Sequence, residues 1–179
     1  RSAYDNFYLT EKLFTLDNTS NNTVNTILSR VGEICEFEVD LLENDISYPY
    51  AQRLNGLTCR EVISYIAAFT GNNARFNPDG KLELTWYVDS ETTIDAYRFS
   101  SPLEVGEKDA VLGGVSCTYK TFSISEENEI SEDSILEVKN DDLCETINFS
   151  SLYMDSTQLN KIFSKINGFT FRSGTIKWI

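Results

Sequence analysis

The sequence of 179 residues contains no histidine. Histidine is the commonest general base near neutral pH and the commonest metal ligand, so its absence excludes Ser-His-Asp and Cys-His catalytic arrangements within this chain. Two-carboxylate chemistry stays open, because 28 aspartate and glutamate residues are present. No pair of them stands out in the sequence, however. We therefore expect no catalytic residues and no enzyme activity.

Cysteine is scarce as well. The four cysteines are far apart in the sequence, so no zinc knuckle or redox pair follows from their spacing: Cys35, Cys59, Cys117 and Cys144. Two disulfides remain formally possible. We favour buried free thiols in a reducing cytoplasm, because a secreted scaffold stabilised by disulfides would carry more cysteine. No metal and no cofactor is expected.

Basic residues are outnumbered, and long apolar runs are missing. With 15 lysines and arginines against 28 acidic residues, the net charge is −13. This charge argues against nucleic acid, whose phosphates require a basic face, and against anionic membrane surfaces. No stretch is long enough to span a bilayer, and no signal peptide is seen. The chain starts without methionine at Arg1 and stops inside an apolar run at Ile179, so we expect both ends to be cut from a longer protein.

Three segments have the pattern of amphipathic helices. The strongest lies between Thr58 and Gly71, where Glu61 completes a capping box with Thr58 and the glycine suits the helix end. Another covers residues 156–167, and a weaker one starts after Thr23.

Strand signals follow the helices. Residues 73–86 predict a hairpin around the turn Asn77–Gly80. Further strand candidates are 115–120, 134–138, 145–149 and 169–179. The acidic stretch 125–142 lacks the regular aspartate spacing of a calcium loop, and we interpret it as a solvated hairpin tip.

The order of elements is not strictly alternating, which disfavours a doubly wound parallel sheet. We expect an α+β fold with mixed or antiparallel sheets, or partial barrels, and three amphipathic helices. Two subdomains are predicted. Residues 1–90 form a helix–strand subdomain with the hairpin 73–86, and residues 91–179 form a β-rich subdomain with the helix 156–167.

Several motifs resemble the tail-tip proteins of bacteriophages and prophages. The run GLTCREVISYIAAFTGNNARFNPDGKLELTWY carries most of this resemblance. The matching positions are Thr58, Arg60, Glu61, Val62, Ile63, Tyr65, Ile66, Ala67, Ala74, Arg75, Asp79, Gly80, Lys81, Leu82 and Leu84. The opening Ala3-Tyr4-Asp5 and the late segments 166–172 and 176–178 also resemble this family. Residues 89–146 match it poorly.

The resemblance implies a structural role in the tail tip or baseplate hub, connecting the tail tube to the spike or tip. It implies a homotrimer in the full-length context, with tube, distal tail and spike proteins as partners. The location would be the virion tail tip, or the bacterial cytoplasm during assembly. Only the hub portion is matched, without the hydrolase that some members carry. The pattern identifies no interface residue.

Each motif residue also has a folding explanation: a cap, a core face or a turn. Arg60 and Arg75 are expected to make local surface ion pairs. One alternative function is a cell-wall carbohydrate-binding module, since nine tyrosines and two tryptophans supply stacking surfaces. Trp86 and Trp178, however, lie in alternating strands and are expected in a core. The other alternative is a hydrolase that uses paired carboxylates.

Overall fold

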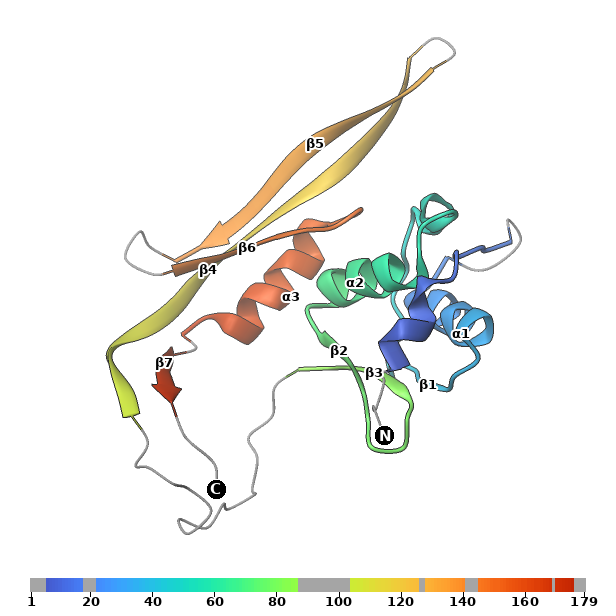
Figure 1. Ribbon diagram of the computed structural model, residues 1–179. Helices are drawn as coiled ribbons and strands as arrows, with labels where there is room; N and C mark the ends of the chain where they lie inside the picture. The colour runs from blue at the N-terminus through green and yellow to red at the C-terminus, as the bar shows by residue number, and fades with distance from the viewer. Residues whose placement is uncertain are drawn as a thin grey trace.

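In the part of the chain that the structure describes, the fold combines three α-helices with two mixed sheets. The computed structural model describes residues 6–17, 22–86, 104–125, 128–140, 145–168 and 170–175. The helices are α1 (Val24–Cys35), α2 (Cys59–Thr70) and α3 (Ser156–Ile166), with short 3-10 helices η1 (Asn6–Glu11) and η2 (Ala51–Leu54). The strands are β1 (Val39–Asp40), β2 (Asn73–Phe76), β3 (Leu82–Thr85), β4 (Glu104–Ser125), β5 (Asn128–Lys139), β6 (Glu145–Ser150) and β7 (Thr170–Thr175). Figure 1 shows their arrangement.

The helices start where short polar side chains can satisfy free backbone N–H groups. The Thr58 hydroxyl accepts from the Glu61 amide at 3.2 Å, and the Glu61 carboxylate accepts from the Thr58 amide at 2.8 Å. The Asp155 carboxylate likewise accepts from the Gln158 amide at 2.8 Å and caps α3. The three predicted helices are therefore confirmed.

The first sheet has the strand order β1-β3-β2. Strands β2 and β3 form the predicted hairpin, and the Asn77 side chain accepts from the amides of Asp79 and Lys81 to hold its turn. Gly80 adopts a φ of 81°, which suits glycine. The two-residue strand β1 pairs parallel to β3, and the sequence analysis did not predict it.

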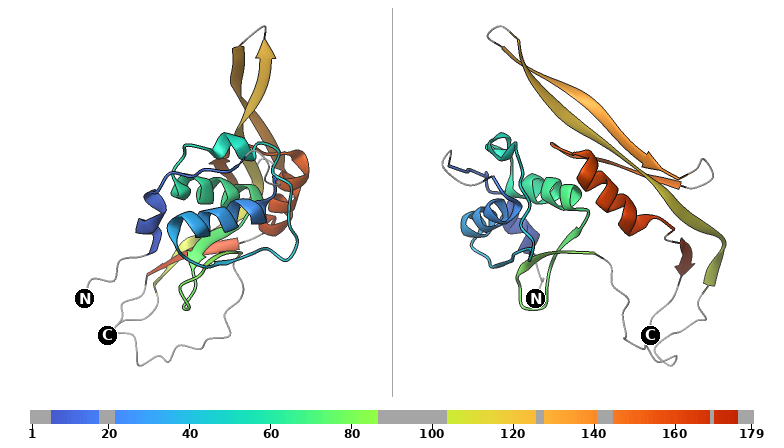
Figure 2. Two further views of the ribbon diagram at one scale, coloured as in Figure 1. Left: turned by 90° about the vertical axis from the view of Figure 1, so that its right-hand side faces the viewer. Right: turned by 180° about the vertical axis from the view of Figure 1, so that it is seen from behind.

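The second sheet is built on the long strand β4. Strand β5 pairs antiparallel along one edge of β4, β6 pairs parallel with it, and β7 pairs antiparallel with the beginning of β4. The β4–β5 hairpin projects well beyond the helices in every view (Figures 1 and 2).

The interpretation of residues 125–142 as a hairpin tip is wrong for most of that stretch. Residues from Asn128 to Lys139 form β5, an arm of the hairpin, and each has a partner in β4. Pairing with β4 stabilises this acidic strand, and the Lys120 ammonium lies 2.6 Å from the Asp133 carboxylate across the ladder. Residues 126–127, at the turn itself, lie outside the described residues.

The α+β class with mixed sheets and three helices is confirmed. Neither sheet closes into a barrel within the described ranges. Helix α3 packs on β4 and β5. One core contains Val24 and Phe69 together with Val115 and Leu159. The division into subdomains 1–90 and 91–179 stays a prediction.

Gly71 is the position at which α2 ends and meets α3. It adopts a left-handed φ of 62°, and its N–H bonds back to the helix. A Cβ atom added there would lie 2.5 Å from Cγ1 of Ile162 in α3, too close for any side chain. Glycine therefore serves both the turn and the approach of the two helices.

We predict that Gly71→Ala costs about 2–4 kcal/mol of unfolding free energy, because it adds overpacking against Ile162 to backbone strain. Gly56→Ala is the matched control. Gly56 has a φ of 86° but nothing within 4 Å of an added Cβ, so only the strain, about 1 kcal/mol, should remain. Urea unfolding followed by circular dichroism measures both variants. Equal losses would show that the α2–α3 contact tolerates a methyl group.

Candidate functional site

The residues that carry the family resemblance lie in fold-forming positions. Val62, Ile63 and Ile66 are buried on the inner face of α2. Arg60 lies 2.9 Å from the Glu11 carboxylate, and Arg75 pairs with Glu83 across the β2–β3 hairpin. Both arginines thus make surface ion pairs, as the sequence predicted, but only the Arg75 pair is local, because Glu11 lies far from Arg60 in the sequence. The Arg60–Glu11 pair is largely exposed and contributes at most about 1 kcal/mol. Two of the motif residues, Ala67 and Ile166, line an apolar pocket, and neither carries a reactive group.

Several carboxyl groups are held in their ionised form. Hydrogen bonds from Lys12 and Lys81 lower the pKa values of Glu36 and Glu38, and the Thr58 backbone amide lowers the pKa of Glu61. A two-carboxylate hydrolase needs one carboxyl with a raised pKa to act as the acid. These three residues are therefore unsuited to that role.

A metal centre has equally little support. In the ranges that the structure describes, no three His, Cys, Asp or Glu side chains are placed to hold a metal ion together. Nor do the described helices include one long and apolar enough to cross a membrane. The predictions of no enzyme activity and no cofactor stay predictions.

An apolar pocket of about 320 Å³ lies between the end of α2, α3 and the β4–β6 edge. Its walls include Ala67, Trp86, Val115, Phe149 and Ile162. Among the residues that the structure describes, no charged side chain lines it, and its polar walls come from two asparagines. These walls can contact apolar atoms but include no titratable group that could act as a general acid or base.

Lys165 beside this pocket has a pKa lowered by burial. A lowered lysine pKa can mark a nucleophile. Here, however, the Nζ atom donates to the carbonyls of Thr70 and Gly71 at 3.2 and 3.0 Å and to Asn72 Oδ1 at 2.8 Å. The first two acceptors are free carbonyls at the C-terminus of α2. Lys165 thus caps one helix from another, and its ammonium lies 5.7 Å from the Trp86 ring centroid.

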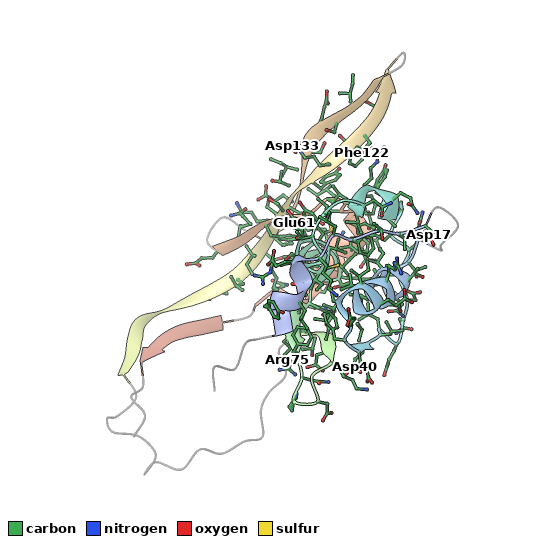
Figure 3. All side chains as sticks on the ribbon, turned by 45° about the vertical axis from the view of Figure 1, so that its right-hand side comes forward. Asp17, Asp40, Glu61, Arg75, Phe122 and Asp133 are labelled. Atoms are coloured by element: carbon green, nitrogen blue, oxygen red, sulfur yellow. The ribbon has the colours of Figure 1, made fainter. Side chains whose placement is uncertain are left out.

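A cluster of aromatic rings joins the hairpin to the helical half. We call it the aromatic junction, and its rings are Tyr48, Tyr50, Phe69, Phe122 and Tyr153. Ring centroids lie 5.1 to 5.9 Å apart along the chain of contacts, a favourable spacing for aromatic pairs. Phe122, labelled in Figure 3, extends the cluster onto β4. The Arg53 guanidinium lies 4.4 Å from the centroid of its ring.

This packing weighs against a carbohydrate-binding module. Such a module would present a row of exposed rings. The rings of the aromatic junction contact one another, and Trp86 packs against the core. Among the residues whose exposure is described, the large hydrophobics that are exposed include a single aromatic, Tyr8, at 64%. Trp178 lies outside the described residues.

Comparison with known proteins gives no assignment of its own. No protein-family model and no curated protein matches this chain. The prediction of a tail-tip role therefore depends on the motifs quoted above.

The length of the projecting hairpin is not predicted by the sequence patterns described above. The sequence did contain a pattern typical of two long strands. Ile130, Leu136 and Val138 alternate along β5 and share a face of the hairpin with Val115, Cys117 and Tyr119 of β4. The acidic residues between them obscured this period of two. The hairpin leaves one edge of β5 without a described strand beside it.

The buried thiol and hydroxyl groups lead to a prediction of how the unfolding free energy changes at alkaline pH. Burial raises the pKa of Cys59 to about 12 and of Cys117 to about 11, and it also raises the pKa of Tyr48. The unfolded chain releases the thiol protons near pH 9.0, the ordinary pKa of a cysteine thiol, whereas the folded chain keeps them. The unfolding free energy should therefore fall as pH rises from 9 through 12.

Urea unfolding at pH 8, 9, 10 and 10.5 measures this decline. Cys59→Ala is the control, because it removes one of the shifted groups and should make the decline shallower, whatever it costs at pH 8. An unchanged decline in that variant would assign the effect to other groups.

Proposed function

We propose that this chain is a structural component of the tail tip or baseplate hub of a phage or phage-like particle, connecting the tail tube to the spike or tip. The observation that supports it is the placement of the motif residues. The run that resembles tail-tip proteins forms one continuous unit, α2–β2–β3, in which its residues serve as caps, core and turn. That is how a scaffold would use recurring residues.

An assembly domain also needs surfaces for its neighbours. Exposed apolar side chains lie on several sides of the chain: Tyr8, Leu13, Leu41, Val111, Ile130, Ile135 and Ile147. Two of them belong to β5, in the hairpin that projects beyond the helices (Figure 2). In the proposed assembly these surfaces contact other copies in a homotrimer and the tube, distal tail and spike proteins.

The location of the protein tests this proposal. In particles purified from the bacterium that encodes the chain, antibodies raised against it should label one end of the tail in electron micrographs. Quantitative mass spectrometry should find three copies per particle if the hub is a trimer. An antibody against the tube protein serves as the control, because it should label the whole tail. Labelling of the capsid, or absence from purified particles, would contradict the proposed role.

The net charge of the chain leads to a separate prediction about how self-association depends on salt. Three copies bring together three charges of −13. Salt shortens the screening length from about 10 Å at 0.1 M to about 3 Å at 1 M, so self-association should strengthen as salt rises. Light scattering of the chain at both salt concentrations measures this. Weaker association at high salt would instead indicate basic patches meeting acidic ones across the interface.

A further inference from the structure

The outer edge of β5 is a long row of backbone groups that point away from β4. The Asn140 amide donates to the Gly113 carbonyl at 2.8 Å, which fixes the phase of the antiparallel ladder. Bonded and non-bonded positions alternate in such a pair. The odd-numbered residues from Glu129 to Glu137 therefore direct their N–H and C=O groups outward, and the described part of the chain places no strand along this edge.

This edge lacks most of the features that protect an edge strand from pairing. β5 has 12 residues, about twice the usual length of a strand, and it contains no proline. Its register with β4 is continuous, without a bulge. The remaining protective feature is charge, because residues 128–139 include four acidic residues and one lysine. A second copy would bring an equally acidic strand to the same edge.

The side chains along the outer edge of β5 indicate which kind of strand could pair with it. Asp133, Ile135 and Glu137 alternate along β5, so their side chains share one face, and their backbone groups point outward. Ile135 is 69% exposed, and the flanking carboxylates are exposed as well. The edge thus presents the order acidic, apolar, acidic. A strand with the order basic, apolar, basic at alternate positions would complement it.

We propose that the outer edge of β5 binds an extended basic segment of another protein by strand addition. The partner's backbone continues the ladder, its apolar side chain covers Ile135, and its two basic side chains lie beside Asp133 and Glu137. The Lys120–Asp133 pair is largely exposed, so Asp133 can accept a second cation at little cost. The inference concerns this one edge and does not depend on the tail-tip role.

The first test uses the full chain and a fluorescent peptide of about ten residues, in which lysine and valine alternate with threonine in the order Lys-Thr-Val-Thr-Lys. Binding is measured by fluorescence anisotropy at low and moderate salt. A peptide of the same composition with adjacent lysines is the control, and it should bind about tenfold more weakly. Equal binding of the two peptides would mean unspecific attraction to an acidic protein and would overturn the proposal.

Two variants test the edge itself. Ile135→Pro removes an outward N–H group but no hydrogen bond to β4, so the hairpin should persist while peptide binding falls about tenfold. Ile135→Thr is the matched control for the backbone, because it keeps the N–H group and should bind more tightly than Ile135→Pro. Glu137→Lys should also weaken binding, whereas Glu43→Lys makes the same charge change on an exposed residue outside the hairpin and should not. Circular dichroism and amide exchange in β4 verify that the hairpin remains.

Two results would overturn the inference. Peptide binding that survives Ile135→Pro would place the site elsewhere. Self-association of the chain that is lost in Ile135→Pro would identify a second copy, and not a basic partner, as the occupant of the edge.

Discussion

The close contact between the end of α2 and the side of α3 is the constraint on which the other features depend. It requires glycine at position 71, because Ile162 fills the space where a Cβ would lie. Lys165, one turn of α3 later, donates to the last carbonyls of α2 and fixes the approach of the two helices. With α3 held there, Val115 and Cys117 of β4 can join the same core as Phe69. The second sheet therefore rests on the helical half through this contact.

The same contact explains how a long two-stranded ribbon can project from a small protein. An isolated hairpin is marginally stable in water. Here the base of the ribbon is buried under α3 through Val115 and Leu136, and Phe122 further along β4 contacts Tyr50 and Arg53. The aromatic junction thus supports the hairpin at a second point. These two contacts position β5 so that one edge pairs with β4 and the other edge has no described strand beside it.

The parts of the fold that the sequence predicted are those with local signals. The Thr58–Glu61 capping box and the Asn77–Gly80 turn each lie within four residues, and both formed as expected. The parallel pairing of β1 with β3, the parallel pairing of β6 with β4 and the Lys165 cap join residues far apart in the chain. No local pattern specifies them. Within β5 the sequence predicts a strand only at 134–138 and a hairpin tip for the rest, because acidic residues lower strand propensity, whereas the strand is stabilised by its pairing with β4. For the candidate site, the sequence predicted the structural roles of Arg60 and Arg75, but not the edge of β5.

An acidic edge strand offers a physical solution to a problem that assembly proteins share. A long unprotected edge would pair with other copies and aggregate. Repulsion between like strands suppresses that pairing without a proline or a bulge, so the edge stays straight and able to hydrogen-bond. The same charges attract a basic strand, and the exposed Ile135 between two carboxylates adds an apolar contact that only a matching register can make. Specificity then comes from repulsion of the wrong partner as much as from attraction of the right one. Such an edge can remain unpaired in a crowded solution until a basic strand binds to it. Proteins that assemble in a defined order require this property.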